Sequence, residues 1–298
     1  MFIIHYMYSE TKISVGGVCC GINSKNEFLI SKIRSLYKNF VSKKKPDIKL
    51  YLKSTRLTYK KPRVSKLNSM LIKTVTSDVY SVQKDMINNN EIKIVCNVLK
   101  IKNSNISGFF SRVRNSGYFE INFTVTPTPY VNQILSSCLA FYLLKKDGIL
   151  LHSSAVKVGK KGFAFIASST GGKSTIVRLI EKEKVLNDEF NVIRLEKDNV
   201  RVYGTPFGGD HTPNNISAVL KCLFLIKKSS KTRVDKLYVR DALTELIKNE
   251  YLFLTTGYKK MRENLLFEVI EKTSDILEKT DYKRLSFHLS TDIKRNLF

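Results

Sequence analysis

The chain has 298 residues, of which 43% are hydrophobic and 26% are charged, a composition that excludes global disorder, collagen and a coiled coil. Lys and Arg number 51 against 26 Asp and Glu, so the net charge is +25. No apolar run approaches the roughly 20 residues that cross a bilayer, and we expect neither a membrane span nor a signal peptide. The five cysteines form no C-x-x-C pair, so we expect a cytoplasmic protein without a disulfide framework or a cysteine-based zinc site.

Residues 1–126 predict a β-rich basic module whose role the sequence does not assign. Residues 28–41 have helical spacing of their apolar positions. Four segments rich in Ile, Val, Tyr and Phe predict strands, at residues 48–52, 78–83, 91–101 and 118–125. The asparagines of residues 88–90 fit a hairpin turn.

A basic stripe occupies residues 43–66, where Asp47 is the one acidic residue. Its ten basic residues are Lys43, Lys44, Lys45, Lys49, Lys53, Arg56, Lys60, Lys61, Arg63 and Lys66. Such a stripe attracts an acidic partner, a phosphorylated ligand or nucleic acid. A general lysine bias explains it equally, because the chain has 38 Lys against 13 Arg.

The residues Thr126, Pro127, Thr128 and Pro129 mark a boundary, and we expect residues 127–298 to form a second, mixed α/β domain. Its first helix is expected over residues 130–146, closed by Gly148. Later helices are expected at residues 173–184, 241–251 and 264–279. Strands are expected at residues 149–158, 162–168, 184–190, 191–197, 199–204, 218–228 and 285–289.

The most informative stretch is residues 163–179, where an apolar strand enters a loop of small residues and Gly172, Lys173, Ser174 and Thr175 open a helix. This is the arrangement of a phosphate-binding loop, in which backbone N–H groups surround phosphate oxygens. Lys173 can reach the β- and γ-phosphates, and the Ser174 hydroxyl can ligate Mg²⁺. The expected nucleotide-binding residues are Ser168, Ser169, Thr170, Gly171, Gly172, Lys173, Ser174 and Thr175. The alternative is a glycine-rich turn beside a surface lysine.

Two further features accompany the loop. Asp188 and Glu189 end a predicted strand, where carboxylates can hold Mg²⁺ or accept a proton from an attacking hydroxyl. His152 lies on the strand that we expect to pair, as a hairpin, with the strand feeding the loop, so its side chain can face the γ-phosphate. A solvated acidic turn and a hydrogen-bonded core histidine are the structural alternatives.

Together these pieces resemble the catalytic domain of HPr kinase/phosphorylase and its small relatives in peptide-modification systems. The matching residues are His152 to Val156, Ser169, Gly172, Lys173, Ser174 and Asp188, followed by the GTPFGGD segment of residues 204–210. The resemblance covers residues 149–226 well and residues 1–126 hardly at all. It implies a kinase fold related to phosphoenolpyruvate carboxykinase, ATP and Mg²⁺ as cofactors, Asp188 as the base and its neighbour Glu189 as a metal ligand.

Four positions depart from the family pattern. Ala167 and Thr170 stand where the family usually has glycine, Glu189 replaces a second aspartate, and Asn187 stands where a small residue is common.

We therefore consider three hypotheses for the function. The first is a kinase with Asp188, Lys173 and His152 as catalytic residues, acting on a serine of a protein or peptide or on a small molecule. The second is an ATP-binding accessory protein without phosphotransfer. The third is a nucleic-acid binder using the basic stripe, in which Tyr51 and Tyr59 could stack on bases. The sequence disfavours it because no recognition motif is present. The acceptor and the assembly state, including an oligomer, stay open.

Overall fold

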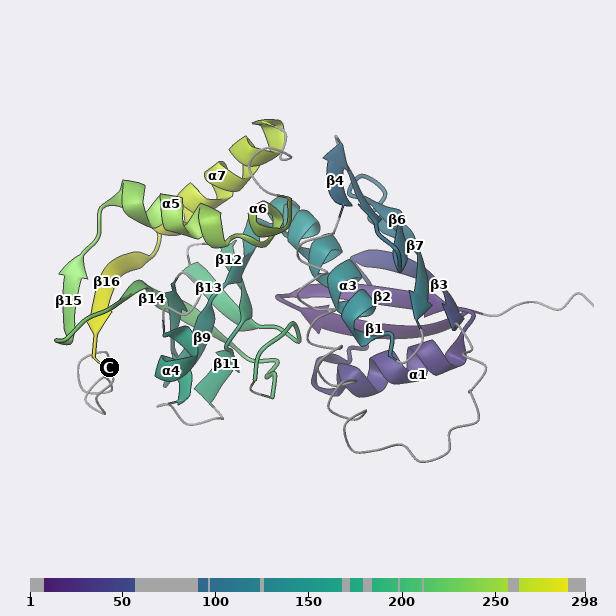
Figure 1. Cartoon of the computed structure of the whole chain (residues 1–298), viewed down its shortest axis with the longest axis horizontal. Helices are drawn as coiled ribbons and strands as arrows, with labels where there is room; N and C mark the ends of the chain where they lie inside the picture. Colours follow the sequence, from purple (N-terminus) through teal and green to yellow (C-terminus); the bar gives the residue numbers. More distant parts are fainter. Residues whose placement is uncertain are drawn as a thin grey trace, which may run out of the picture.

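The structure is a computed structural model that describes residues 8–56, 91–95, 97–123, 126–167, 172–178, 184–197, 199–210, 212–256 and 263–288. It is a mixed α/β structure with two sheets. Figure 1 shows the sheets on either side of a central helix, α3, Thr128–Leu143. Among these residues no helix is both long and apolar enough to cross a membrane.

The N-terminal sheet has seven strands in the order β1-β2-β3-β7-β6-β5-β4. They are β1 Ser9–Val15, β2 Val18–Ser24, β3 Ile48–Arg56, β4 Glu91–Val95, β5 Val98–Lys102, β6 Ile106–Ser111 and β7 Ser116–Phe123. Alternating burial along β5 and β7 places one side of the sheet in the core and leaves the other exposed. Asn26 caps the N-terminus of helix α1, Glu27–Leu36. The helix buries Leu29, Ile30 and Ile33.

The C-terminal sheet has nine strands, of which seven follow the path β11-β9-β10-β14-β13-β12-β8. These are β8 Gly148–His152, β9 Ser154–Val158, β10 Lys161–Ile166, β11 Val185–Asn187, β12 Phe190–Glu196, β13 Asn199–Gly204 and β14 Ser217–Lys228. The long strand β14 also pairs with β16, Asp281–Phe287, which pairs with β15, Arg233–Lys236. Strands β11 and β8 lie at the two ends of this path. The β8–β9 connection at Ser153 and the β11–β12 connection at Asp188 and Glu189 lie side by side. There the Ser153 amide donates to the Glu189 carbonyl (3.0 Å), and the Asn191 side chain donates to the Ser153 carbonyl (2.6 Å).

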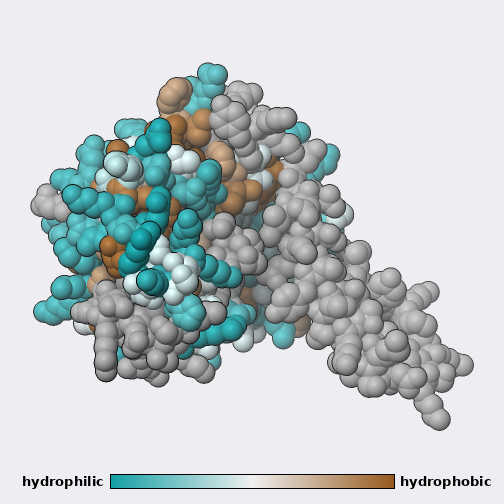
Figure 2. Space-filling view, turned by 60° about the vertical axis from the view of Figure 1, so that its left-hand side comes forward, coloured by the Kyte–Doolittle hydropathy of each residue, from teal (hydrophilic) through white to brown (hydrophobic). Residues whose placement is uncertain are grey.

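Helices cover both faces of the C-terminal sheet (Figure 1). The short helix α4, Lys173–Arg178, packs over β9 and contributes Ile176 and Val177 to a smaller apolar cluster. The opposite side carries α5 Val239–Asn249, α6 Tyr251–Thr256 and α7 Glu263–Glu278. The larger apolar cluster contains residues of both sheets and of α3, so the two modules share one core. Among the residues coloured in Figure 2, hydrophilic ones cover most of the left-hand part, and hydrophobic ones gather toward the upper middle.

Several predicted boundaries are wrong in an informative way. Residues 91–101 form the hairpin β4–β5 rather than one strand, because polar Asn97 lies at a turn between the two apolar runs. Residues 149–158 are split at Ser153 into β8 and β9, which pair with different neighbours. The 3₁₀ turn Leu144–Lys146 follows α3, and Asp147, rather than Gly148, adopts the left-handed conformation that ends it. Elements β1, β2, β6, α6 and β15 were not predicted. The predicted strand at 78–83 and turn at 88–90 lie outside the described residues.

Candidate active site

Strand order places Ala167, the residue before the predicted phosphate-binding loop, and the acidic turn at the same edge of the C-terminal sheet. Strand β9 lies between β10 and β11 and is antiparallel to both, so β10 and β11 run in the same direction. Ala167 follows β10, and Asp188 follows β11. Because both positions come directly after the carboxyl ends of parallel strands, the sheet brings them to one edge.

The chain returns from the loop at Gly172, where only glycine fits. Gly172 has φ = +100°, and a Cβ there would lie 2.5 Å from the ring Cζ of Phe287 on β16. Helix α4 begins at the next residue, and the Ile176 amide donates to the Gly172 carbonyl (3.2 Å). The backbone at this position is therefore fixed by contact with β16, far along the chain.

The side chain of Lys173 folds back toward the end of β10. Its Nζ donates to the carbonyl of Ala167 at 3.1 Å, so the two ends of the loop segment are joined by one side chain. The residue is buried, and this burial lowers the pKa of its ammonium group, while the charge of Glu189 opposes the shift. An anion bound at the loop would provide a charged partner for this cation.

Asn187 shapes the acidic turn. Its side-chain oxygen accepts hydrogen bonds from the amides of Glu189 (2.6 Å) and Phe190 (2.8 Å). Its side-chain nitrogen donates to the carbonyls of Thr205 (2.9 Å) and Gly208 (3.4 Å). Asn187 is buried; the two accepted bonds hold the turn, and the two donated bonds tie it to the GTPFGGD segment. The departure from the family pattern noted at this position is thus a structural anchor of the turn.

Asp188 is buried, with 3% of its surface exposed. Its Oδ2 accepts a hydrogen bond from the amide of Asp210 (3.1 Å), and its Oδ1 has no hydrogen-bond partner among the atoms that the structure describes. Gly209, at φ = +92°, packs directly against Oδ1. A buried carboxylate oxygen without a donor is costly, and a bound cation or hydroxyl proton would satisfy it.

Glu189 and His152 form a pair beside Asp188. His152 Nε2 lies 3.3 Å from Glu189 Oε1. Burial raises the pKa of Glu189, but the hydrogen bond and charge of His152 and the charge of Lys173 together lower it below its usual value. Glu189 therefore stays ionised and connects the histidine to the lysine electrostatically.

The predicted route of His152 to the site is wrong. His152 ends β8, which pairs with β12 in the register Phe190↔His152, whereas the strand that pairs with β10 is β9. The imidazole thus reaches the site from the β12 side, with its ring 5.3 Å from that of Phe190. It contacts Glu189 all the same, because β12 begins directly after the acidic turn.

Of the predicted site residues, Lys173, Glu189 and His152 interact in the structure, and Asp188 is the chain neighbour of Glu189. Ser168, Ser169, Thr170 and Gly171 lie outside the described residues, as does the side chain of Ser174, while Thr175 is half-buried in α4. Sequence reasoning missed the positioning roles of Asn187, Gly209 and Phe287. The sequence did carry a signal for Gly209. The adjacent glycines Gly208 and Gly209 of the GTPFGGD segment allow the backbone to approach a side chain closely, here that of Asp188.

In the described part of the chain, no group of three or more His, Cys, Asp and Glu side chains forms a ready metal centre. The donor set nevertheless suits Mg²⁺ bound with a nucleotide, since this ion keeps waters and takes one or two carboxylates plus phosphate oxygens. Asp188, through its unpartnered Oδ1, and the ionised Glu189 would be those carboxylates.

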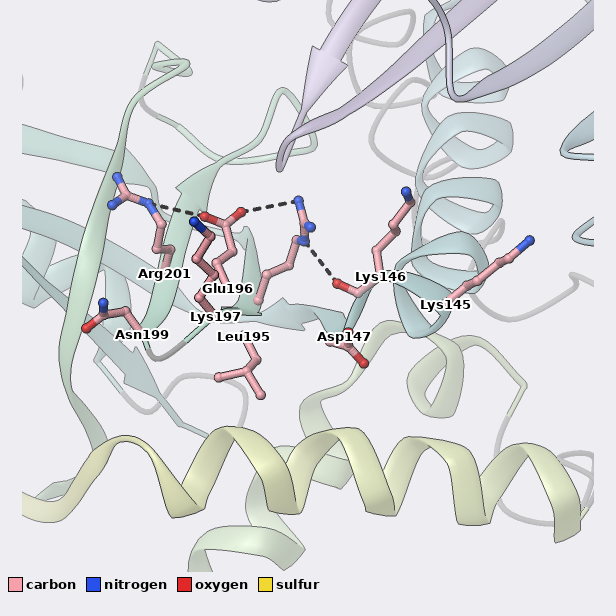
Figure 3. Close-up of a pocket in the computed structure, with 9 residues that line it drawn as sticks. Lys145, Lys146, Asp147, Leu195, Glu196, Lys197, Asn199 and Arg201 are labelled. Atoms are coloured by element: carbon pink, nitrogen blue, oxygen red, sulfur yellow. Dashed lines mark hydrogen bonds and ion pairs between the residues drawn. The ribbon is translucent and has the colours of Figure 1, made fainter.

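A separate hollow of about 550 Å³ lies beside the Leu144–Lys146 turn and the β12–β13 hairpin (Figure 3). Its two arginines share an acidic partner: Glu196 lies 3.4 Å from Arg194 Nη1 and 3.8 Å from Arg201 Nε. Arg194 also donates to the carbonyls of Gly16 (2.8 Å) and Lys146 (3.1 Å). The hollow is lined by the C-terminal module, and Arg194 on its wall links that module to the N-terminal one, so we do not assign it to the active site.

The basic stripe is described up to residue 56, and its remaining part lies outside the described residues. Lys43, Lys44, Lys45 and Lys49 are exposed, and Lys53 pairs with Glu120 at 2.7 Å. No protein-family model matches the chain, and no curated protein sequence matches it.

Proposed function

We propose that this protein is a kinase that uses ATP and Mg²⁺ and transfers the γ-phosphate to a hydroxyl group of a protein or peptide serine or of a small molecule. One observation carries the proposal: Asp188 holds a buried, unpartnered carboxylate oxygen at the edge of the sheet where Lys173 also lies. A lysine and a carboxylate that flank a phosphate-binding loop are the groups that phosphoryl transfer requires.

Each residue then has a role that follows from its surroundings. Lys173 binds the phosphates in exchange for its present bond to the Ala167 carbonyl. Asp188 accepts the proton of the attacking hydroxyl. His152 is a positioning residue, because it keeps Glu189 ionised and oriented toward the site. When bound between Asp188, Glu189 and the phosphates, Mg²⁺ would neutralise negative charge on the phosphoryl group.

The direct test is a titration of the full chain with ATP and Mg²⁺ by calorimetry. We expect Lys173→Ala to weaken binding by about 10- to 100-fold, the value of one charged hydrogen bond. Lys160→Ala is the matched control, because Lys160 is an exposed lysine at the Gly159–Lys160 turn of the same module. Equal binding by wild type and Lys173→Ala would remove the loop assignment.

Phosphate transfer is tested separately, by mass spectrometry of candidate acceptors and by release of inorganic phosphate from ATP with water as the acceptor. ATP binding without either product would favour the accessory protein over the kinase. A family resemblance limited to residues 149–226 supports the proposal, and the acceptor is expected to be defined by the remaining parts of the chain.

A further inference from the structure

The exposed face of the N-terminal sheet carries a row of aromatic side chains. Strand register places Tyr51 on β3 beside Tyr118 on β7, and Tyr118 beside Phe109 on β6. The Tyr51 and Tyr118 rings stack at 4.9 Å with an interplanar angle of 12°, and Phe109 continues the row at 5.9 Å. The Tyr8 ring meets Tyr51 edge-on at 5.8 Å. We name these four residues the aromatic row.

The row is unusually exposed for large rings. Tyr8, Phe109 and Tyr118 are 51%, 44% and 53% exposed, and all four rings line one hollow of about 710 Å³. Cross-strand stacking stabilises a sheet, but it leaves the ring edges and the end of the stack open to solvent. Several exposed rings gathered in one hollow indicate a binding surface.

A lysine lies at each end of the aromatic row, Lys100 beside Phe109 and Lys25 beside Tyr8. The next residue across the sheet from Phe109 is Lys100 on β5, which is exposed. No further ring follows Phe109 in the register, so a flat aromatic ligand can pack against the exposed surface of Phe109 with Lys100 beside it. At the other end, the Lys25 ammonium lies 5.6 Å from the centre of the Tyr8 ring.

The charge around the row favours a polyanion. Residues 8–56 and 91–123 contain 16 Lys and Arg against 5 Asp and Glu, a net charge of +11. Two acidic residues on the exposed face have cationic partners: Glu120 pairs with Lys53 (2.7 Å) and Glu10 with Lys12 (3.3 Å). Polar side chains also line the hollow, namely Ser24, Asn26, Ser54 and Ser107, of which the first three hydrogen-bond within the protein.

We propose that the aromatic row binds single-stranded nucleic acid, with bases added to the ring stack and phosphates beside the lysines. A single strand supplies both components that this surface matches, flat bases and a regular negative charge. An acidic peptide would use the lysines and leave the rings unoccupied, and a duplex keeps its bases stacked inside. This inference does not depend on the proposed kinase activity, and it differs from the stripe hypothesis because the strand register, rather than the lysine count, carries it.

The test uses fluorescence anisotropy of the full chain with a labelled RNA of about 12 nucleotides, within the site sizes of single-strand binders. We expect Tyr118→Ala to weaken binding about tenfold and Tyr118→Phe to bind as wild type, because the ring is kept. Tyr118→Leu keeps apolar bulk without a π face and is expected to lose as much affinity as the alanine variant. Tyr238→Ala is the matched control, since Tyr238 is 82% exposed in the other module.

Three results would overturn the proposal: equal affinity of Tyr118→Ala and Tyr238→Ala, equal affinity of Tyr118→Leu and wild type, or a duplex of the same sequence binding as tightly as the single strand. Displacement of the RNA by polyglutamate at equal charge would also overturn it, since only attraction between charges would then be at work. Lys173→Ala is expected to bind the RNA normally and Tyr118→Ala to bind ATP normally, so failure of one proposal is distinguishable from failure of the other.

Discussion

Gly209 packs so closely against Asp188 that a methyl group on residue 209 would overlap Oδ1 of the carboxylate. The glycine backbone thus forms one wall of the pocket that holds the acid, while the amide of Asp210 binds the other oxygen. The position of the carboxylate is therefore set by a segment that follows it by some twenty residues, as the bond between Asp188 and Asp210 shows.

Gly209→Ala should displace the Asp188 carboxylate and reduce both phosphate release from ATP and stability. Gly159→Ala is the control, because Gly159 also has positive φ, +59°, but has nothing within 4 Å of a Cβ. The control should lose about 1–2 kcal/mol from backbone strain alone and retain activity. Equal loss of activity in the two variants, measured beside urea unfolding, would show that strain rather than contact is responsible.

Asp188→Asn should reduce phosphate transfer by about 100-fold or more, because a general base is lost. The same variant should be as stable as wild type or more stable, since it removes a buried charge with one unpartnered oxygen. Asp210→Asn keeps the backbone donor and changes only an exposed ion pair with Arg178, so it should retain activity. Steady-state phosphate release and urea unfolding of both variants measure the contrast. A fully active Asp188→Asn enzyme would exclude Asp188 as the base.

Asn187→Ala should lower the free energy of unfolding by about 3 kcal/mol, because it leaves buried amides and carbonyls without their partners. Asn214→Ala is the comparison: its half-buried side chain makes one bond, to the Val185 carbonyl at 2.9 Å, and should cost about 1 kcal/mol. Chemical denaturation gives both values. Similar losses in the two variants would mean that Asn187 does not organise the turn.

Glu250 should make stability fall as the pH rises. Burial raises its pKa from 4.5 to about 7, against the opposing hydrogen bonds of the Phe253 and Leu252 amides. The folded protein therefore holds a proton that the unfolded chain releases between these two pH values. The stabilising contribution is complete below the unfolded pKa of 4.5 and is lost as the pH rises through about 7.

The free energy of unfolding should change by about 3 kcal/mol over this pH range, because each unit of pKa shift is worth about 1.4 kcal/mol. Glu250→Gln should remove that part of the pH dependence and should be relatively more stable at about pH 8 than at about pH 5 when each is compared with wild type. Urea unfolding at the two pH values measures it. Parallel pH dependence in wild type and variant would show that Glu250 is ionised in the folded protein.

Local sequence patterns identified much of the C-terminal module. The apolar run before Ala167 and the helical spacing after Lys173 predicted β10 and α4, because period and turn residues are properties of neighbouring positions. The same reasoning placed Asp188 and Glu189 at the end of a strand. It failed at Ser153, where one continuous apolar run is divided between two strands with different partners. Which strands pair with each other depends on the whole sheet, and the local sequence of residues 149–158 does not indicate it.

The sequence by itself determined that a lysine follows a small-residue loop and that an acidic pair follows a strand, since both are contiguous patterns. Only the tertiary structure decided that β10 and β11 end at one edge, that His152 reaches Glu189 from β8, and that Tyr51, Tyr118 and Phe109 align in a row. These relationships join residues far apart in the chain. They arise from strand order and register, which are set by the packing of the entire core rather than by any local preference.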